Sequence, residues 1–114
     1  MMQALLDYLW HYLWQRPTCA LTGTRPRSPK WPNARRAWLA KHPRCEATGC
    51  LEEVEVHHIE PFHERPALEL DETNFISLRR DVHLLLGHLD NWKSHNPSVV
   101  NDARKLRAKI DSRP

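Results

Sequence analysis

Four of the histidines in the middle of the chain have a residue type and an order that suit metal-dependent hydrolysis. His57 and His58 are adjacent, and His83 and His88 follow further along the chain. Histidine is the commonest metal ligand, and its ordinary pKa also suits it to act as a general base near neutral pH. These imidazoles therefore predict one site that holds a metal ion and activates a water molecule beside it.

The adjacent histidines end a predicted strand over residues 51–57, in which apolar and acidic residues alternate. Neighbouring side chains on a strand point to opposite faces, so chelation of one ion by both histidines is not expected. One histidine is predicted to bind the metal and the other to face the reacting water. His57 shares a face with Glu55 and His58 shares a face with Val56, and the pattern leaves open which histidine has which role.

His83 and His88 are predicted to lie on a helix over residues 83–89, with Asp81 as its N-cap. Their separation of five corresponds to about 500° of rotation on an ideal α-helix, or about 140° away from a shared face. His83 is therefore the expected ligand opposite the strand. His88 is a second-rank candidate, which would need Gly87 to loosen the turn.

Two polar residues near the histidines each have two interpretations. Asn74 can donate and accept hydrogen bonds, so it either orients an imidazole or serves as a turn residue after Thr73. His63 lies in a long polar loop predicted over residues 59–73. Long loops in compact domains are often functional, so His63 either contacts a phosphate or the metal, or is simply solvated.

The order of predicted elements around the histidines is strand, loop, strand, helix. It predicts an α+β fold whose small ββα core holds a single metal, with flanking helices at both ends. Residues 1–26 are expected to contain an amphipathic N-terminal helix and a Pro-rich linker, and residues 27–114 the domain with the histidines and a C-terminal helix. The remaining expected elements are a helix over 2–15, a linker over 16–32, a basic helix over 33–41, a turn over 45–50, a strand over 74–78 and a helix over 98–110.

Length, charge and cysteine content limit the classes of function. The 114 residues form one domain at most, and three cysteines without a secretory signal indicate a reducing, cytoplasmic location. No apolar run is long enough for a bilayer, so no membrane partner is expected. The net charge is +3, but residues 25–44 carry seven basic residues and no acid, whereas residues 46–72 carry nine acids and one base. Such basic segments suit a polyanion such as nucleic acid, and equally suit solvated helix faces.

The motifs together resemble the HNH endonuclease family, whose core is a ββα-metal fold. Residues 55–61 (EVHHIEP) resemble its first motif, residues 74–78 (NFISL) its middle motif, and His83 the histidine of its last motif. The flanks resemble a bacterial and phage subgroup, and the likeness covers roughly residues 27–105. The flanking segments are residues 27–31 (RSPKW), 41–45 (KHPRC), 83–89 (HLLLGHL) and 91–94 (NWKS).

The resemblance implies a role for each of the residues singled out above. His58 would be the general base, His57 and His83 the metal ligands, and His88 a third ligand, while Asn74 would hold the hairpin loop and help to orient His58. The activity implied is hydrolysis of phosphodiester bonds in DNA, with a double-stranded partner, using one divalent metal that the residues leave open among Mg, Mn, Ni and Zn. The residues expected to contact DNA are Arg35, Arg36, His63, Arg79 and Arg80.

One departure from the family concerns its structural zinc, which many relatives bind through two cysteine pairs. Here Cys45 and Cys50 stand in place of the first pair, and Arg79 and Val82 in place of the second. Two cysteines cannot fill a tetrahedral site, so no structural zinc is expected. Two other classes of function remain as alternatives: a catalytically inactive ββα module that binds nucleic acid, and a small structural metal-binding domain.

Overall fold

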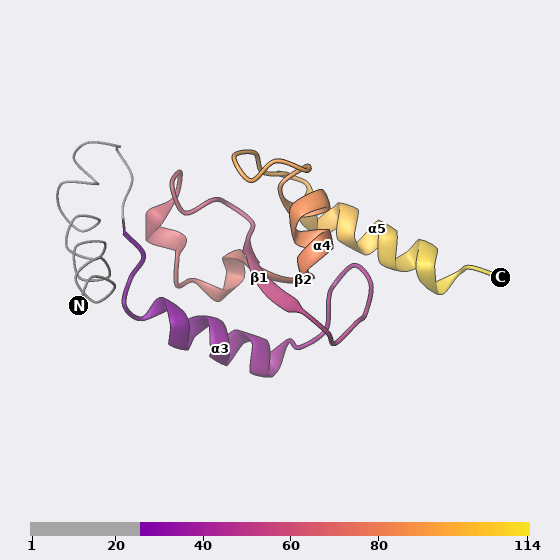
Figure 1. The fold of residues 1–114 in the computed structure, drawn as a ribbon, viewed down its shortest axis with the longest axis horizontal. Helices are drawn as coiled ribbons and strands as arrows, with labels where there is room; N and C mark the ends of the chain where they lie inside the picture. The colour runs from indigo at the N-terminus through magenta and orange to yellow at the C-terminus, as the bar shows by residue number, and fades with distance from the viewer. Residues whose placement is uncertain (1–25) are drawn as a thin grey trace, which may run out of the picture.

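The computed structural model describes residues 26–114, in which two antiparallel strands and three α-helices form an α+β fold (Figure 1). The expected helix over residues 2–15 and most of the Pro-rich linker lie outside the described residues. The elements are α3 (Trp31–Lys41), β1 (Val54–His58), β2 (Phe75–Arg79), α4 (Arg80–Val82) and α5 (Val99–Asp111). Two 3-10 turns (Pro66–Leu68 and Glu72–Asn74) and a π-helical turn (His83–Gly87) complete the chain.

The two strands form a hairpin whose ends differ from the predicted ones. In the antiparallel register Val54 pairs with Arg79 and His58 with Phe75. The first strand begins later than predicted because Glu53 has a left-handed φ of 54°, which interrupts extended backbone. The second begins at Phe75 because Asn74 belongs to the preceding 3-10 turn.

The two faces of the hairpin are covered by different elements. Helix α3 lies on one face, where Trp38 donates a hydrogen bond from Nε1 to Oγ of Ser77 at 2.9 Å and packs edge-on against Phe75. On the other face Ile76 and Leu78 of β2 join a buried cluster with Val99 and Ala103 of α5. The sheet is thus the middle layer between α3 and the C-terminal helices (Figure 1).

Helices α3 and α5 lie close to their predicted ranges. Helix α3 begins two residues before the predicted start, at Trp31, so that Pro32 falls in its first turn, where its missing N–H is tolerated. Helix α5 is displaced by one residue from the predicted range. Neither of these helices, nor any other in residues 26–114, is long and apolar enough to cross a membrane.

The predicted helix over residues 83–89 differs from the observed structure in kind. Helical backbone starts at Arg80, with Arg79 as its N-cap, so Asp81 lies in the first turn instead of capping it. From His83 to Gly87 the helix widens into a π-helical turn. Left-handed φ angles at Leu89 and Asp90 then end it.

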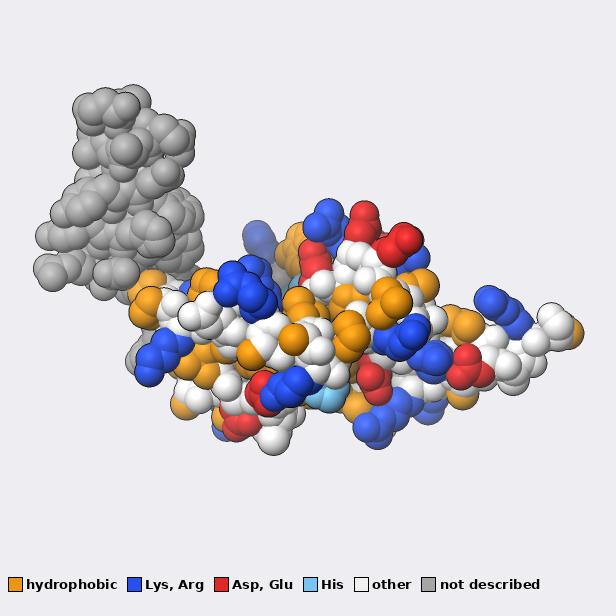
Figure 2. Space-filling view, turned by 90° about the horizontal axis from the view of Figure 1, so that it is seen from below, with side chains coloured by type: hydrophobic (Ala, Val, Ile, Leu, Met, Phe, Trp, Pro, Cys, Tyr) orange, Lys and Arg blue, Asp and Glu red, His pale blue; other side chains and the backbone are white. Residues whose placement is uncertain are grey.

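Charged side chains cover much of the surface. On the face shown in Figure 2, Lys and Arg side chains are spread along the molecule from α3 towards the C-terminal end. Acidic side chains lie among them on the same face. This face therefore carries charges of both signs.

Candidate metal centre

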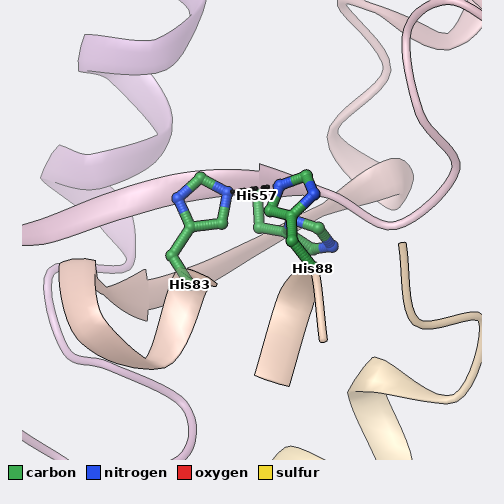
Figure 3. A group of neighbouring side chains, drawn as sticks. All are labelled: His57, His83 and His88. Carbon is green, nitrogen blue, oxygen red and sulfur yellow. Dashed lines mark hydrogen bonds between the residues drawn. The ribbon is translucent and has the colours of Figure 1, made fainter. Parts of the chain in front are cut away.

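Three of the four central histidines converge on one point. His57 comes from β1, and His83 and His88 come from the beginning and the end of the π-helical turn (Figure 3). One ring nitrogen of each lies within 4.8 Å of the others, which is close enough for all three to hold one metal ion. The expected ligands His57 and His83 are thus brought together, and His88 joins them.

The π-helical turn is the reason that His88 belongs to the group. The backbone N–H of His88 donates to the carbonyl oxygens of both His83, at 3.1 Å, and Leu84, at 3.2 Å. In a π-helix the hydrogen bond spans five residues, so residues five apart come round to nearly the same face, as residues four apart do in an α-helix. The Nε2 atoms of His83 and His88 consequently lie 3.2 Å apart. The α-helical estimate of about 140° between them was wrong because it assumed 3.6 residues per turn.

Hydrogen bonds on the far side of two rings fix which nitrogen is free. Nδ1 of His83 lies 3.0 Å from Oε1 of Glu55, and Nδ1 of His88 lies 2.7 Å from the carbonyl oxygen of Ser94. Both oxygens only accept in these contacts, so each Nδ1 carries the hydrogen and, in the neutral rings, each Nε2 keeps its lone pair. Two lone pairs facing each other at this distance repel, and a cation between them would remove the repulsion.

The surroundings of His57 also favour a cation. The residue is 2% exposed, and within residues 26–114 neither Nδ1 nor Nε2 has a hydrogen-bond partner. Burial, with smaller contributions from His83 and His88, lowers the pKa of His57 to about 3, so the ring is neutral at physiological pH. A buried, neutral and unpaired imidazole is costly by itself, whereas it is ready for a metal.

Gly87 provides the space in which His57 lies. A Cβ at this position would come within 3.0 Å of Cε1 and Nδ1 of His57. Such a contact is tighter than most side chains make, so with a larger residue the ring or the turn would have to shift by a few tenths of an ångström. The absence of a side chain at Gly87 therefore allows the π-helical turn to approach β1 closely.

Glu55 links the centre to the positive charge of Arg80. Its carboxylate accepts hydrogen bonds from His83 Nδ1 and from Arg80 Nε, both at 3.0 Å. Partial burial alone would raise the pKa of Glu55, but these hydrogen bonds outweigh it and lower the pKa below its ordinary value. The carboxylate is therefore ionised and holds His83 in one orientation. The sequence motifs indicate no role for Glu55. Its position two residues before His57 on the strand nevertheless predicts that both side chains lie on the same face.

His58 lies on the opposite face of β1, as the strand pattern predicted. Its ring packs between Trp31 and Phe75 and is 8% exposed. Nε2 lies 2.9 Å from the carbonyl oxygen of Glu69, so Nε2 donates and Nδ1 is the nitrogen with the lone pair. Burial lowers the pKa of His58 against the opposing effect of this hydrogen bond, with Arg27 and His83 lowering it further. The ring is thus neutral and fixed in one tautomer, which is the state of a general base.

Glu69 also connects His58 to the start of the described chain. Its carboxylate is buried and accepts the backbone N–H of Ser28 with both oxygens, at 3.0 and 3.1 Å. Arg27 lies 4.0 Å from the same carboxylate. No sequence motif indicated this contact, because residues 28 and 69 meet only through the tertiary fold.

Asn74 closes the loop between the two strands. Its Oδ1 accepts from the backbone N–H of Glu60 at 2.8 Å, and its Nδ2 donates to the carbonyl oxygen of Glu60 at 3.1 Å. The backbone carbonyl of Asn74 accepts from the N–H of Ile59 at 2.8 Å. Asn74 therefore holds the backbone that immediately follows His58, and these contacts are with backbone atoms rather than with the imidazole.

The other predicted site residues lie outside this group. His63 is exposed and lies 3.9 Å from the carboxylate of Glu64, and Arg35 and Arg36 are exposed on α3. Arg79 lies 3.3 Å from the carboxylate of Asp81, and its Nη1 lies 3.8 Å from Sγ of Cys50. Cys45 is buried in the core and Cys50 is half-buried, and both are free thiols.

Comparisons with models of protein families, with curated proteins and with solved structures found no match to this chain.

Proposed function

We propose that this chain is a metal-dependent endonuclease of the HNH type that hydrolyses phosphodiester bonds in DNA. In this proposal β1, β2 and the helical segment over residues 80–87 form a ββα-metal core. The observation that carries it is the division of two neighbouring histidines between two tasks. His57 turns towards two further imidazoles, while His58 is held on the other face with one ring nitrogen bonded and the other bearing a lone pair.

In the proposed reaction His58 is the general base. Its Nδ1 takes a proton from the attacking water, while the hydrogen bond from Nε2 to the carbonyl of Glu69 steadies the imidazolium that forms. Trp31 and Phe75 restrict rotation of the ring. The burial that keeps His58 neutral also keeps it available as a base at neutral pH.

The three ligands His57, His83 and His88 fit a divalent transition metal. Imidazole nitrogen is a ligand that Zn and Ni accept readily, and three protein ligands leave room for a phosphate oxygen or water. When bound, such an ion supplies a Lewis acid that stabilises charge on the phosphoryl and leaving oxygens. Mg or Mn would need additional oxygen ligands from water and phosphate.

Positive charge near the centre supports a polyanionic substrate. Arg80 is exposed beside the Glu55–His83 pair, and Arg27 lies on the His58 side, where its guanidinium packs over Trp31 and Phe62. Arginine forks match the geometry of phosphate oxygens. The two guanidiniums are therefore assigned to the phosphates that flank the scissile bond.

Plasmid nicking tests the proposal directly. The full chain is assayed with Mg, Mn, Ni or Zn, comparing wild type with His58→Ala and His57→Ala. His58→Ala is expected to lower the rate by about 10²- to 10⁴-fold, the usual contribution of a general base. His42→Ala removes an exposed histidine and should leave the rate close to wild type.

The same assay separates the alternative functions. Equal nicking by wild type and His58→Ala would show that the base is misassigned. DNA binding without cleavage under every metal would identify a nucleic-acid-binding module. Metal binding without either DNA binding or cleavage would identify a structural metal domain.

A further inference from the structure

An exposed tryptophan borders the candidate metal centre. The ring of Trp92 lies edge-on to His83, with 5.2 Å between ring centroids, and tilted against His88 at 4.8 Å. Trp92 is nevertheless 57% exposed, and no other Phe, Tyr or Trp in residues 26–114 is as exposed. One side of the indole thus touches two proposed metal ligands while much of its surface faces solvent.

The backbone over residues 88–94, which includes Trp92, is fixed by its dihedral angles and hydrogen bonds. Leu89 and Asp90 both have left-handed φ angles, of 54° and 65°, although neither is glycine. Such backbone is unfavourable and persists where surrounding contacts enforce it, often at functional sites. Here the backbone N–H of Asp90 donates to the carbonyl of Leu84 at 2.9 Å, and His88 Nδ1 donates to the carbonyl of Ser94 at 2.7 Å.

Further hydrogen bonds close the turn on both sides of the tryptophan. The N–H of Asn91 donates to the carbonyl of His88 at 3.1 Å, and Oδ1 of Asn91 accepts the N–H of Lys93 at 2.9 Å. Asn91 and Ser94, on either side of Trp92, are thus both hydrogen-bonded to His88, one of the proposed metal ligands. Trp92 is held at the edge of the centre by its backbone, without being buried.

The chemistry of a nucleotide accounts for an aromatic ring in this place. Under the proposed function, the scissile phosphate would lie beside the ion that His57, His83 and His88 would hold, so the attached sugar and base would occupy the space next to these rings. Every nucleobase has an apolar π-face, and stacking on an exposed aromatic side chain binds single strands without regard to sequence. Lys93, exposed and next in the chain, supplies charge for the neighbouring backbone.

We propose that the indole of Trp92 is a stacking site for a base of an unpaired DNA strand, next to the phosphate held at the metal centre. In an intact duplex both faces of each base are covered by neighbouring bases, and inserting a side chain between them costs unstacking energy. An unpaired base presents its face without that cost. This inference rests on the proposed nuclease function and narrows its substrate from DNA in general to single-stranded or locally opened DNA.

Oligonucleotide binding without cleavage tests the inference. The full chain carrying His58→Ala, which removes the proposed base so that no strand is cleaved, is saturated with Zn and titrated against a fluorescein-labelled oligothymidylate and a labelled hairpin duplex, with fluorescence anisotropy as the readout. Trp92→Ala should weaken binding of the single strand by about tenfold or more, while Trp92→Phe, which keeps an aromatic face, stays within about threefold. Leu51→Ala removes an apolar side chain of similar exposure, 58%, outside the centre, and should change neither affinity.

Three results would overturn the inference. The first is unchanged single-strand affinity in Trp92→Ala. The second is an equal loss for the strand and the duplex, which would indicate contact with sugar or backbone. The third is a loss of Zn binding by Trp92→Ala in calorimetry, which would show that the indole supports the histidines and does not bind a base. Because binding is measured in a variant that lacks the proposed base, the assay does not depend on cleavage. A wild-type protein that cleaves no DNA would refute the proposed nuclease function without affecting the measured affinities.

Discussion

At the scale of single residues, adjacent histidines have opposite environments. His57 lies buried beside two other imidazoles and has no hydrogen-bond partner in the described part of the chain, whereas His58 donates to a carbonyl and packs between aromatic rings. The alternation of side chains along a strand is sufficient to produce this division. The two imidazoles therefore differ in hydrogen bonding and packing because of their surroundings, although they are the same residue type.

The depressed pKa of His57 predicts how the metal-free protein responds to acid. The folded ring has a pKa of about 3 and the unfolded ring about 6.5, so the unfolded state takes up the proton first as the pH falls. The stability that depends on a neutral His57 is therefore intact above about pH 6.5 and is lost progressively down to about pH 3, with about 2 kcal/mol gone by pH 5. Urea unfolding at a series of pH values, with a chelator present, measures this loss.

His57→Asn is the control for the acid prediction, because asparagine has a similar size and does not titrate. The variant should lose less stability than wild type between neutral pH and about pH 5. Equal losses in the two proteins would contradict the assignment of the effect to His57.

Glu55 gives a second prediction at this scale. Removing its carboxylate in Glu55→Ala frees the ring of His83 to rotate, and loss of such a partner usually lowers metal affinity by about 10- to 100-fold. Calorimetric titration with Zn or Ni measures the change. Glu52→Ala, an exposed acid just before the strand, is the matched control, and a similar loss there would point to net charge as the cause.

At the scale of elements, the strand that separates the adjacent histidines and the helices α3 and α5 could be predicted from the sequence, whereas the π-helical turn could not. The alternating pattern correctly separated His57 from His58, and helical periodicity located α3 and α5 to within two residues. The widening at residues 83–87 has no signature in hydrophobic periodicity. Periodicity therefore predicts only His83 as a ligand from this segment and leaves His88 a second-rank candidate. The contacts of Glu69 and Trp92 were not predictable either, because they depend on how distant segments meet.

Gly87→Ala tests the close approach of this turn to β1. The added methyl would meet the ring of His57 at 3.0 Å, so either the ring or the turn must move. Overpacking of this kind costs about 1–3 kcal/mol, and here it should also weaken Zn binding by moving a ligand. Thermal unfolding and calorimetry measure the two effects, with Leu85→Ala, in the same turn but exposed, as the comparison. A Gly87→Ala variant with unchanged Zn affinity would refute the spatial argument.

At the scale of the whole molecule, the candidate centre lies between layers. One ligand comes from the sheet and two from the turn beyond it, so a bound ion would connect elements separated by a long loop. The described part of the chain has a small buried core, which a metal would supplement. Ligand binding to the folded state alone adds stability by mass action.

Metal addition should therefore raise the melting temperature markedly. At about 100 times its Kd the ion contributes about 2.7 kcal/mol, which for a domain of this size corresponds to a rise on the order of 10 °C. Differential scanning fluorimetry with Zn or Ni, and then with excess chelator, measures the rise and its reversal. His57→Ala should show no rise, and a rise as large as that of wild type would place the binding elsewhere.

The buried Glu69 has a mechanical consequence. Its backbone carbonyl receives the hydrogen bond of His58, and its side chain receives the N–H of Ser28. The backbone at Ser28 is thus joined through one side chain to the acceptor of the His58 hydrogen bond. A displacement of the chain at Ser28 would therefore shift Glu69, and with it the oxygen that holds the ring of His58 in its orientation.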